Sequence, residues 1–203
     1  MTAIVDYGVG NLFSLQSSFS AIGENVVVTS DVQKIKNSDR VILPGVGAFE
    51  EAAKKLDESG MAELVKSEIA MGKPVMGICL GMQLLFDKSL EYGQFDGLGL
   101  IPGDIVPIRP DVPDTLKIPH IGWNALHFVK DCPIFKFVNE GECVYFVHSF
   151  YAKKGENTVA TTEYGTEITA AVAKDNLFGC QFHPEKSGKT GLNILRAFCE
   201  VKG

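Results

Sequence analysis

Cys79 lies between Gly77 and Gly81, at the point where an apolar run changes from strand-like to helix-like spacing. This is the G-x-nucleophile-x-G pattern of a nucleophile elbow, with cysteine in place of serine. The turn in such an elbow is sharp, and glycine at the flanking positions avoids collisions that larger side chains would make. A cysteine at the beginning of a helix is also favoured as the thiolate, which is the nucleophilic form. The pattern therefore indicates a catalytic cysteine, with a small buried core residue as the alternative.

A cysteine nucleophile requires a base, and usually a third group that orients the base. Among the four histidines, His183 directly follows a predicted strand, which places it at the sheet edge expected for Cys79. Glu185 comes two residues later, and such residues point to the same side of an extended segment. Glu185 can then accept a hydrogen bond from one imidazole nitrogen while the other nitrogen faces the sulfur. His148 is the alternative base, but it has no neighbouring carboxylate.

Acyl chemistry at a cysteine also requires backbone N–H donors that face the developing negative oxygen. Leu80, the residue after the nucleophile, is the natural first donor. The segment Pro44-Gly45-Val46-Gly47 follows another predicted strand, and its two glycines allow the backbone to approach a ligand closely. By analogy with α/β-hydrolases, we expect the second donor to come from this loop.

Composition narrows the class of protein. The 203 residues suffice for one large domain, and contents of 45% hydrophobic and 22% charged residues are ordinary for a soluble globular protein. The net charge of −6 argues against binding to nucleic acid. The longest apolar run is too short to span a membrane, and the first residues lack the features of a secretory signal. The five scattered cysteines form no C-x-x-C pair, so we expect no metal site, no disulfide framework and a cytoplasmic location.

Strand-like and helix-like runs alternate through the first part of the chain. The spacing predicts strands over 2–6, 26–29, 40–43 and 75–78, and helices over 12–22, 32–36, 49–57 and 61–71. A glycine-rich loop is predicted over 91–103. Short β-like runs follow over 104–108, 116–118, 125–129, 143–147, 158–162, 168–173 and 177–182, and a last helix over 191–201. This order indicates an α/β fold with a central, mostly parallel mixed sheet and helices on both faces, built as one domain over 1–203.

Gly8 and Gly10, after the first strand, raise the question of a nucleotide site. The third glycine of the dinucleotide fingerprint is missing, and no acidic residue closes the second strand. The two glycines therefore indicate a tight turn, and the sequence implies no cofactor.

Three motifs occur together in one order: Pro44-Gly45-Val46-Gly47, Gly77-Ile78-Cys79-Leu80-Gly81-Met82-Gln83 and Phe182-His183-Pro184-Glu185. In this combination the chain resembles the class I (triad) glutamine amidotransferases, whose architecture is flavodoxin-like. Further segments resemble the branch of this family that supplies ammonia to a cyclase in histidine biosynthesis: Asp6-Tyr7-Gly8-Val9-Gly10-Asn11-Leu12, Gly97-Leu98-Gly99-Leu100-Ile101-Pro102-Gly103, Pro119-His120-Ile121-Gly122-Trp123-Asn124 and His183-Pro184-Glu185-Lys186-Ser187.

The resemblance implies that Cys79 attacks the side-chain amide of L-glutamine, that His183 transfers the protons and that Glu185 orients His183. It implies oxyanion donors at Val46 and Leu80, and glutamine contacts at Gly47, Gln83, Ser149 and Phe150. The ammonia would pass to a separate cyclase subunit, a (β/α)₈ barrel in this branch. The residues expected near that partner are Val9, Gly10, Asn11, Trp123, Tyr145 and Lys186.

Two alternatives remain at this point. The chain could be the glutaminase of another class I system, such as those of pyridoxal phosphate, purine or pyrimidine synthesis. The Gly122-Trp123-Asn124 and Lys186-Ser187 segments argue against this. It could also be a regulatory subunit that keeps the fold only to bind a partner, but a binding role gives no reason to keep the cysteine, histidine and glutamate together.

Overall fold

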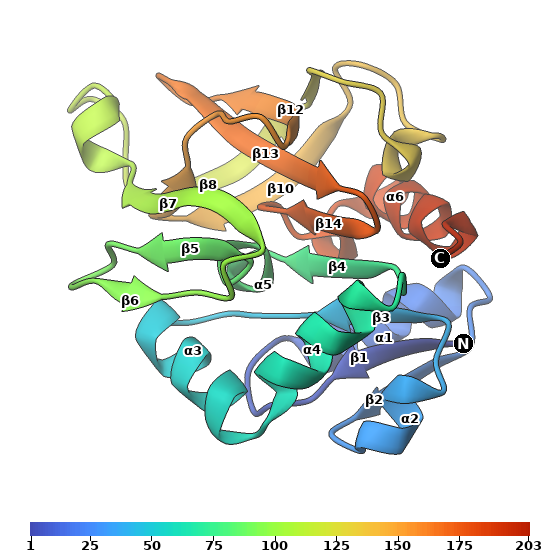
Figure 1. Cartoon of the computed structure of the whole chain (residues 1–203). Coiled ribbons are helices and arrows are strands. Elements are labelled where there is room, and N and C mark those ends of the chain that lie inside the picture. The colour runs from blue at the N-terminus through green and yellow to red at the C-terminus, as the bar shows by residue number, and fades with distance from the viewer.

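The computed structural model describes residues 1–203 as a mixed eight-stranded sheet with helices on both faces and two smaller sheets beside it (Figure 1). The strand order is β2-β1-β3-β4-β14-β13-β12-β9. The first five strands pair in parallel, whereas β13, β12 and β9 pair antiparallel. The strands are β1 (Thr2–Val5), β2 (Val26–Thr29), β3 (Arg40–Leu43), β4 (Val75–Ile78), β9 (His127–Phe128), β12 (Thr158–Glu163), β13 (Glu167–Lys174) and β14 (Leu177–Cys180). The predicted α/β fold with a mostly parallel mixed sheet is confirmed.

The two faces of the sheet have separate apolar cores, because side chains alternate along each strand. In β3, for example, Val41 and Leu43 belong to one core and Ile42 to the other. The first core is covered by α2 (Val32–Lys36), α3 (Phe49–Glu58), α4 (Met61–Ala70) and α5 (Leu80–Gln83), and the second by α1 (Leu12–Ala21) and α6 (Gly188–Glu200). None of these helices combines the length and apolar character needed to cross a lipid bilayer.

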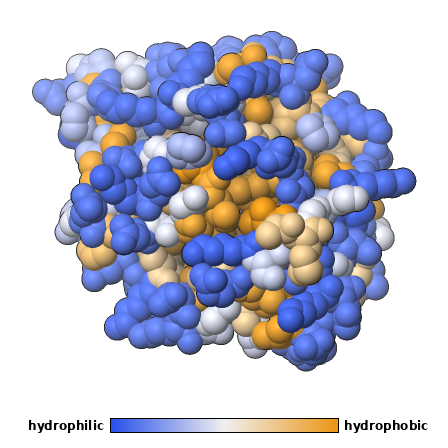
Figure 2. All heavy atoms as spheres, viewed as in Figure 1, coloured by the Kyte–Doolittle hydropathy of each residue, from blue (hydrophilic) through white to orange (hydrophobic).

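Two smaller sheets lie beside the large one, and the first of them adds side chains to the first core and the second to the second core. One has the order β11-β7-β5-β6, and the other pairs β10 with β8. Their strands are β5 (Phe86–Ser89), β6 (Phe95–Asp96), β7 (Ile101–Pro107), β8 (His120–Ala125), β10 (Cys143–His148) and β11 (Phe150–Ala152). Three 3₁₀ turns complete the chain: η1 (Arg109–Asp111), η2 (Pro133–Phe135) and η3 (Pro184–Lys186). In the view of Figure 1, the surface is hydrophilic around its edge and apolar near its centre (Figure 2).

Several boundaries predicted after the elbow are wrong. The segment predicted as loop over 91–103 contains β6 and the start of β7. Both strands form by pairing with β5, and the local sequence pattern does not predict that pairing. No strand forms over 116–118, and the strand predicted over 125–129 is divided, since Ala125 ends β8 and only 127–128 form β9. The helix expected after the elbow ends at Gln83, since the chain turns there to begin β5 three residues later.

The parallel pairing of β4 with β14 positions the predicted chemistry. Gly77 lies opposite Gly179 and Ile78 opposite Cys180, so both strands end at the same edge of the sheet. Cys79 follows directly with φ of 55°, and its backbone N–H donates to the Cys180 carbonyl at 2.8 Å. Carboxyl ends of parallel strands are where open α/β sheets bind their ligands.

Glycines let three segments of backbone meet at the elbow. A Cβ on Gly81 would lie 2.0 Å from the Leu43 carbonyl oxygen, and one on Gly45 would lie 2.6 Å from the Gly81 nitrogen. A Cβ on Gly77 would lie 2.6 Å from the Gly81 oxygen. The end of β3, the loop after it and the beginning of α5 therefore pack backbone against backbone.

We expect Gly81→Ala to destabilise the protein by about 2 kcal/mol or more, because a methyl group cannot be accommodated without moving the β3 or α5 backbone. The measurement is the urea midpoint of unfolding. Gly155→Ala is the matched control, since Gly155 is exposed and a Cβ there would approach only the Lys153 carbonyl, at 4.0 Å. Equal midpoints for the two variants would contradict the close packing described for the elbow.

Candidate active site

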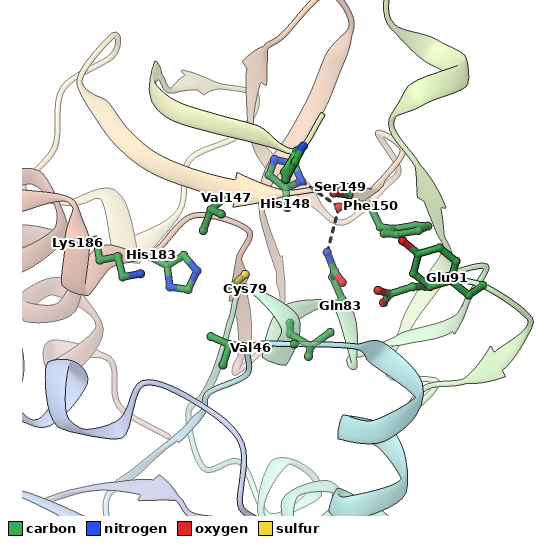
Figure 3. Close-up of a pocket in the computed structure, with 14 residues that line it drawn as sticks. Val46, Cys79, Gln83, Glu91, Val147, His148, Ser149, Phe150, His183 and Lys186 are labelled. Atoms are coloured by element: carbon green, nitrogen blue, oxygen red, sulfur yellow. Dashed lines mark hydrogen bonds between the residues drawn. The ribbon is translucent and has the colours of Figure 1, made fainter. Parts of the chain in front are cut away.

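A pocket of about 300 Å³ opens at the carboxyl edge of the sheet, above the junction of β4 and β14 (Figure 3). Its walls come from the loop after β3, from the elbow, from the ends of β10 and β14, and from the loop after β5. Residues from distant parts of the sequence meet here. Those singled out from the sequence that line the pocket are Val46, Gly47, Cys79, Leu80, Gln83, His148, Ser149, Phe150, His183 and Lys186.

Cys79 and His183 face each other across this pocket (Figure 3). Cys79 is 7% exposed and His183 is 2% exposed, so both are accessible only from the pocket. The His183 Nδ1 donates to Glu185 Oε1 at 2.7 Å, which leaves Nε2 for the sulfur. The other oxygen of Glu185 has no hydrogen-bond partner, so this buried carboxylate is linked to the protein through His183 alone.

The two neighbours determine the charge of His183. Burial by itself lowers the pKa of an imidazole, but the hydrogen bonds and charges of Cys79 and Glu185 outweigh it and raise the pKa of His183 to about 10. His183 is therefore an imidazolium near neutral pH, held between a sulfur and a carboxylate. A proton is available at Nε2 for a group that leaves from a carbon bonded to the sulfur.

His148, the alternative base, has the opposite environment. Its Nδ1 donates to the Phe150 carbonyl at 2.9 Å, and its Nε2 lies 3.0 Å from Nδ1 of His120. Burial is the main cause that lowers the pKa of His148 to about 3. Both ring nitrogens are engaged and no carboxylate supports a charge, so His183 is the better candidate for proton transfer.

The loop after β3 is fixed at its beginning and open at its end. The Tyr7 hydroxyl donates to the Pro44 carbonyl at 2.7 Å, and Gly45 packs against Gly81. Val46 is 41% exposed, and Gly47 has φ of 98° and so much free space that a Cβ added there would meet no atom within 4 Å. Leu80, which packs against Gly45, is the first residue of α5, where backbone N–H groups lack partners within the helix.

Gln83 uses both of its N–H groups within the protein. Its Nε2 donates to the Phe150 carbonyl at 3.0 Å and to Oε1 of Gln181 at 2.9 Å. Only its Oε1 remains to contact a ligand, and that contact must be as an acceptor.

Sequence reasoning missed two pocket residues in the loop after β5. Glu91 lines the pocket and accepts from the Phe49 backbone N–H, at the beginning of α3, at 2.9 Å. Tyr92 is 91% exposed at the rim, with its ring edge-on to Phe150 at 5.8 Å between centroids. The glycine-rich composition of this stretch indicated only a loop. The local sequence pattern does not predict which part of the folded protein a loop contacts.

The residues expected near a partner lie on two sides of the pocket. On one side, Trp123 is 54% exposed, its ring contacts Tyr145 edge-on at 6.0 Å, and the Lys186 ammonium lies 5.8 Å from the Tyr145 centroid. On the other side, Val9 and Gly10 line a second depression that shares Val46 with the first pocket, and Asn11 precedes α1. Their role in binding a partner stays a prediction.

Comparison with known proteins gives a family match over nearly the whole chain. A family model described as "Glutamine amidotransferase class-I" matches residues 3–201. The "Imidazole glycerol phosphate synthase subunit HisH" of Caldanaerobacter subterraneus is 51% identical over 203 residues, which cover 99% of this chain and 98% of that protein. The protein of the same name from Sulfurimonas denitrificans is 48% identical over 205 residues, covering 100% and 99%.

Solved structures resemble the fold at much lower identity. A crystal structure of a glutamine amidotransferase superposes with a TM-score of 0.74 at 16% identity, covering 98% of this chain and 97% of that one. The structure of PurLQS from Thermotoga maritima gives a TM-score of 0.72 at 20% identity, covering 98% and 96%. These likenesses support the architecture predicted from the sequence.

We expect Glu185→Gln to lower the pKa of His183 by about one unit or more. The amide can still accept from Nδ1, but the negative charge that favours the imidazolium is lost, so His183 releases its proton at lower pH. The measurement is an NMR titration of the imidazole. Glu91→Gln is the control, because Glu91 lines the same pocket without bonding to His183. An unchanged pKa in Glu185→Gln would show that the carboxylate does not determine the charge of His183.

Proposed function

We propose that this chain, which belongs to the class I glutamine amidotransferases, is the glutaminase subunit of an imidazole glycerol phosphate synthase and acts in histidine biosynthesis. The observation that carries the proposal is the likeness over nearly the whole chain to proteins of that name, at 51% and 48% identity. The site supports it, because a cysteine, an imidazolium and a carboxylate are the groups that hydrolysis of an amide through a thioester requires.

In the proposed reaction, the thiolate of Cys79 attacks the side-chain amide carbon of L-glutamine. The carbonyl oxygen becomes an oxyanion, which the backbone N–H groups of Val46 and Leu80 stabilise. His183 gives its proton to the amide nitrogen, the C–N bond breaks and ammonia leaves. The neutral His183 then takes a proton from water, whose oxygen attacks the γ-glutamyl thioester, and glutamate and free Cys79 result.

The first step is supported by the charge of His183. With a pKa of about 10, this residue holds the proton that the leaving ammonia needs, and Glu185 keeps the ring oriented through Nδ1. Once the proton has left, the neutral imidazole is a base beside the thioester. The pair can therefore serve both halves of the reaction.

We propose that Gly47, Gln83, Ser149 and Phe150 hold the glutamine. They line the pocket, and Gln83 can contribute only its Oε1 as an acceptor. Glu91 is the only carboxylate among the lining residues, so it is the group that suits the α-ammonium of the substrate.

We propose further that the ammonia passes to a separate cyclase subunit with a (β/α)₈-barrel fold, in a cytoplasmic heterodimer. There it would react with a ribulosyl aminoimidazole carboxamide nucleotide to give imidazole glycerol phosphate and aminoimidazole carboxamide ribotide. The two groups of exposed residues beside the pocket suit a partner that covers its mouth. The extent of the family match, 3–201, supports a single domain over 1–203.

The two alternatives are weaker. For a glutaminase of another class I system, the support is a shared fold at 16–20% identity, well below the 51% identity with the synthase subunit. A purely regulatory subunit does not account for a buried imidazolium aimed at a cysteine within a pocket.

We expect Cys79→Ala to abolish release of glutamate from glutamine, because Cys79 is the only thiol that lines the pocket with His183. The complex with the cyclase should still form product from added ammonium. Cys143→Ala is the control, since Cys143 is exposed on β10 and does not line the pocket. Continued glutamate release by Cys79→Ala would refute the assignment of the nucleophile.

We expect the isolated chain to hydrolyse glutamine slowly and the cyclase with its nucleotide to stimulate it by roughly 5–150-fold, the usual range of coupling between sites. The open end of the loop at Gly47 gives the physical reason, because an incomplete oxyanion site can be completed by the partner. Trp123→Ala should reduce the stimulation. Met71→Ala should not, because Met71 is also an exposed apolar residue, at 65%, but precedes the amino end of β4, away from the pocket at its carboxyl end. Full activity of the chain alone would overturn this expectation.

A further inference from the structure

Gln181 lies directly behind the nucleophile and has no part in the reaction described above. It follows β14, is fully buried, and does not line the pocket. Its side-chain Nε2 lies 3.8 Å from the Sγ of Cys79, within hydrogen-bonding distance of a sulfur acceptor. The sulfur thus has two nitrogen neighbours, the imidazole of His183 and the amide of Gln181.

The direction of this hydrogen bond is determined by a backbone carbonyl. The oxygen of Phe150 can only accept, so the group of Gln83 that lies 3.0 Å from it must be the NH₂ (Figure 3). The same NH₂ lies 2.9 Å from Gln181, which therefore presents its oxygen to Gln83. The NH₂ of Gln181 is then left to face the sulfur.

The reverse orientations fail on the same grounds. Turning the Gln181 amide over would place two NH₂ groups against each other, and turning Gln83 as well would place its oxygen against the Phe150 carbonyl. The carbonyl is itself held by a second donor, Nδ1 of His148 at 2.9 Å. Donor direction is thus transmitted from Phe150 through Gln83 and Gln181 to Cys79.

An N–H group aimed at this sulfur favours its negative form. A hydrogen bond to the charged state of an acid stabilises that state, more so in a buried site. Unlike His183, a neutral amide exchanges no proton with the sulfur, so it supports the thiolate without competing for the proton that the leaving nitrogen needs.

We propose that Gln181 is a further catalytic residue, whose side-chain N–H stabilises the thiolate of Cys79, and that Gln83 is the positioning residue that turns this N–H toward the sulfur. The proposal rests on Cys79 being the nucleophile. It gives Gln83 a second role beside the contact with glutamine.

The test is the pH dependence of Cys79 alkylation by iodoacetamide, followed by mass spectrometry of the peptide that contains Cys79. We expect Gln181→Leu and Gln181→Met to move the midpoint of the alkylation profile upward by about one pH unit, and to slow alkylation about tenfold below the midpoint. Gln83→Met should move the midpoint in the same direction, because Gln181 is then free to turn its NH₂ away.

Thr169→Val is the matched control. Thr169 is also fully buried and loses one side-chain hydrogen bond, to Thr158, but it lies on β13 outside the pocket. The control should leave the midpoint unchanged. Thermal unfolding identifies the variants that remain folded. Leucine is branched and methionine is not, so the two substitutions offer two shapes for the buried space that the Gln181 side chain occupies.

Glutamine kinetics of the complex with the cyclase give a second readout. We expect kcat to fall about tenfold for the Gln181 variants, with little change in KM, because the amide contacts the sulfur and not the substrate. An unchanged alkylation midpoint in a folded Gln181 variant would overturn the proposal. Alkylation needs no glutamine, so a wild-type protein that fails to hydrolyse glutamine would refute the proposed function separately.

Discussion

The parallel pairing of β4 with β14 is the constraint on which the site depends. It brings two segments about a hundred residues apart to one edge of the sheet, in a register that sets Ile78 opposite Cys180. The elbow and the histidine then follow on neighbouring strands. Glycines at the elbow permit the backbones of β3, the loop after it and α5 to touch, so the beginning of the loop, at Gly45, is held against the elbow.

Two histidines in the same pocket show how partners decide charge in a buried site. Burial disfavours the charged form of both. His183 bonds to a carboxylate and a sulfur and becomes cationic, with a pKa of about 10, whereas His148 bonds to a carbonyl and to another imidazole and has a pKa of about 3. The contrast makes His183 the histidine of the pocket that carries a proton to give, whereas His148 serves as a hydrogen-bond donor to the Phe150 carbonyl.

Beside the charged pair of His183 and Glu185, further side chains form a continuous hydrogen-bonded path. From the Phe150 carbonyl it runs through Gln83 and Gln181 to Cys79, and in the other direction through His148 and His120 to strand β8. The Phe150 carbonyl can only accept, so the amides of Gln83 and Gln181 each have one orientation available, as a pre-arranged site requires. The open part of the site is the loop at Val46 and Gly47, where no such bonds hold the backbone.

The sequence alone determined the fold class, the elbow at Cys79 and the pairing of His183 with Glu185, because these depend on spacing within short segments and on glycines that a sharp turn requires. It also predicted most elements of the parallel half of the sheet. Only the tertiary structure decided that Glu91, Tyr92 and Gln181 join the site, and that 91–103 contains strand. The physical reason is the range of the interactions. A turn or a period is a property of neighbouring residues, whereas a strand partner or a hydrogen bond to a distant sulfur exists only after the chain has folded.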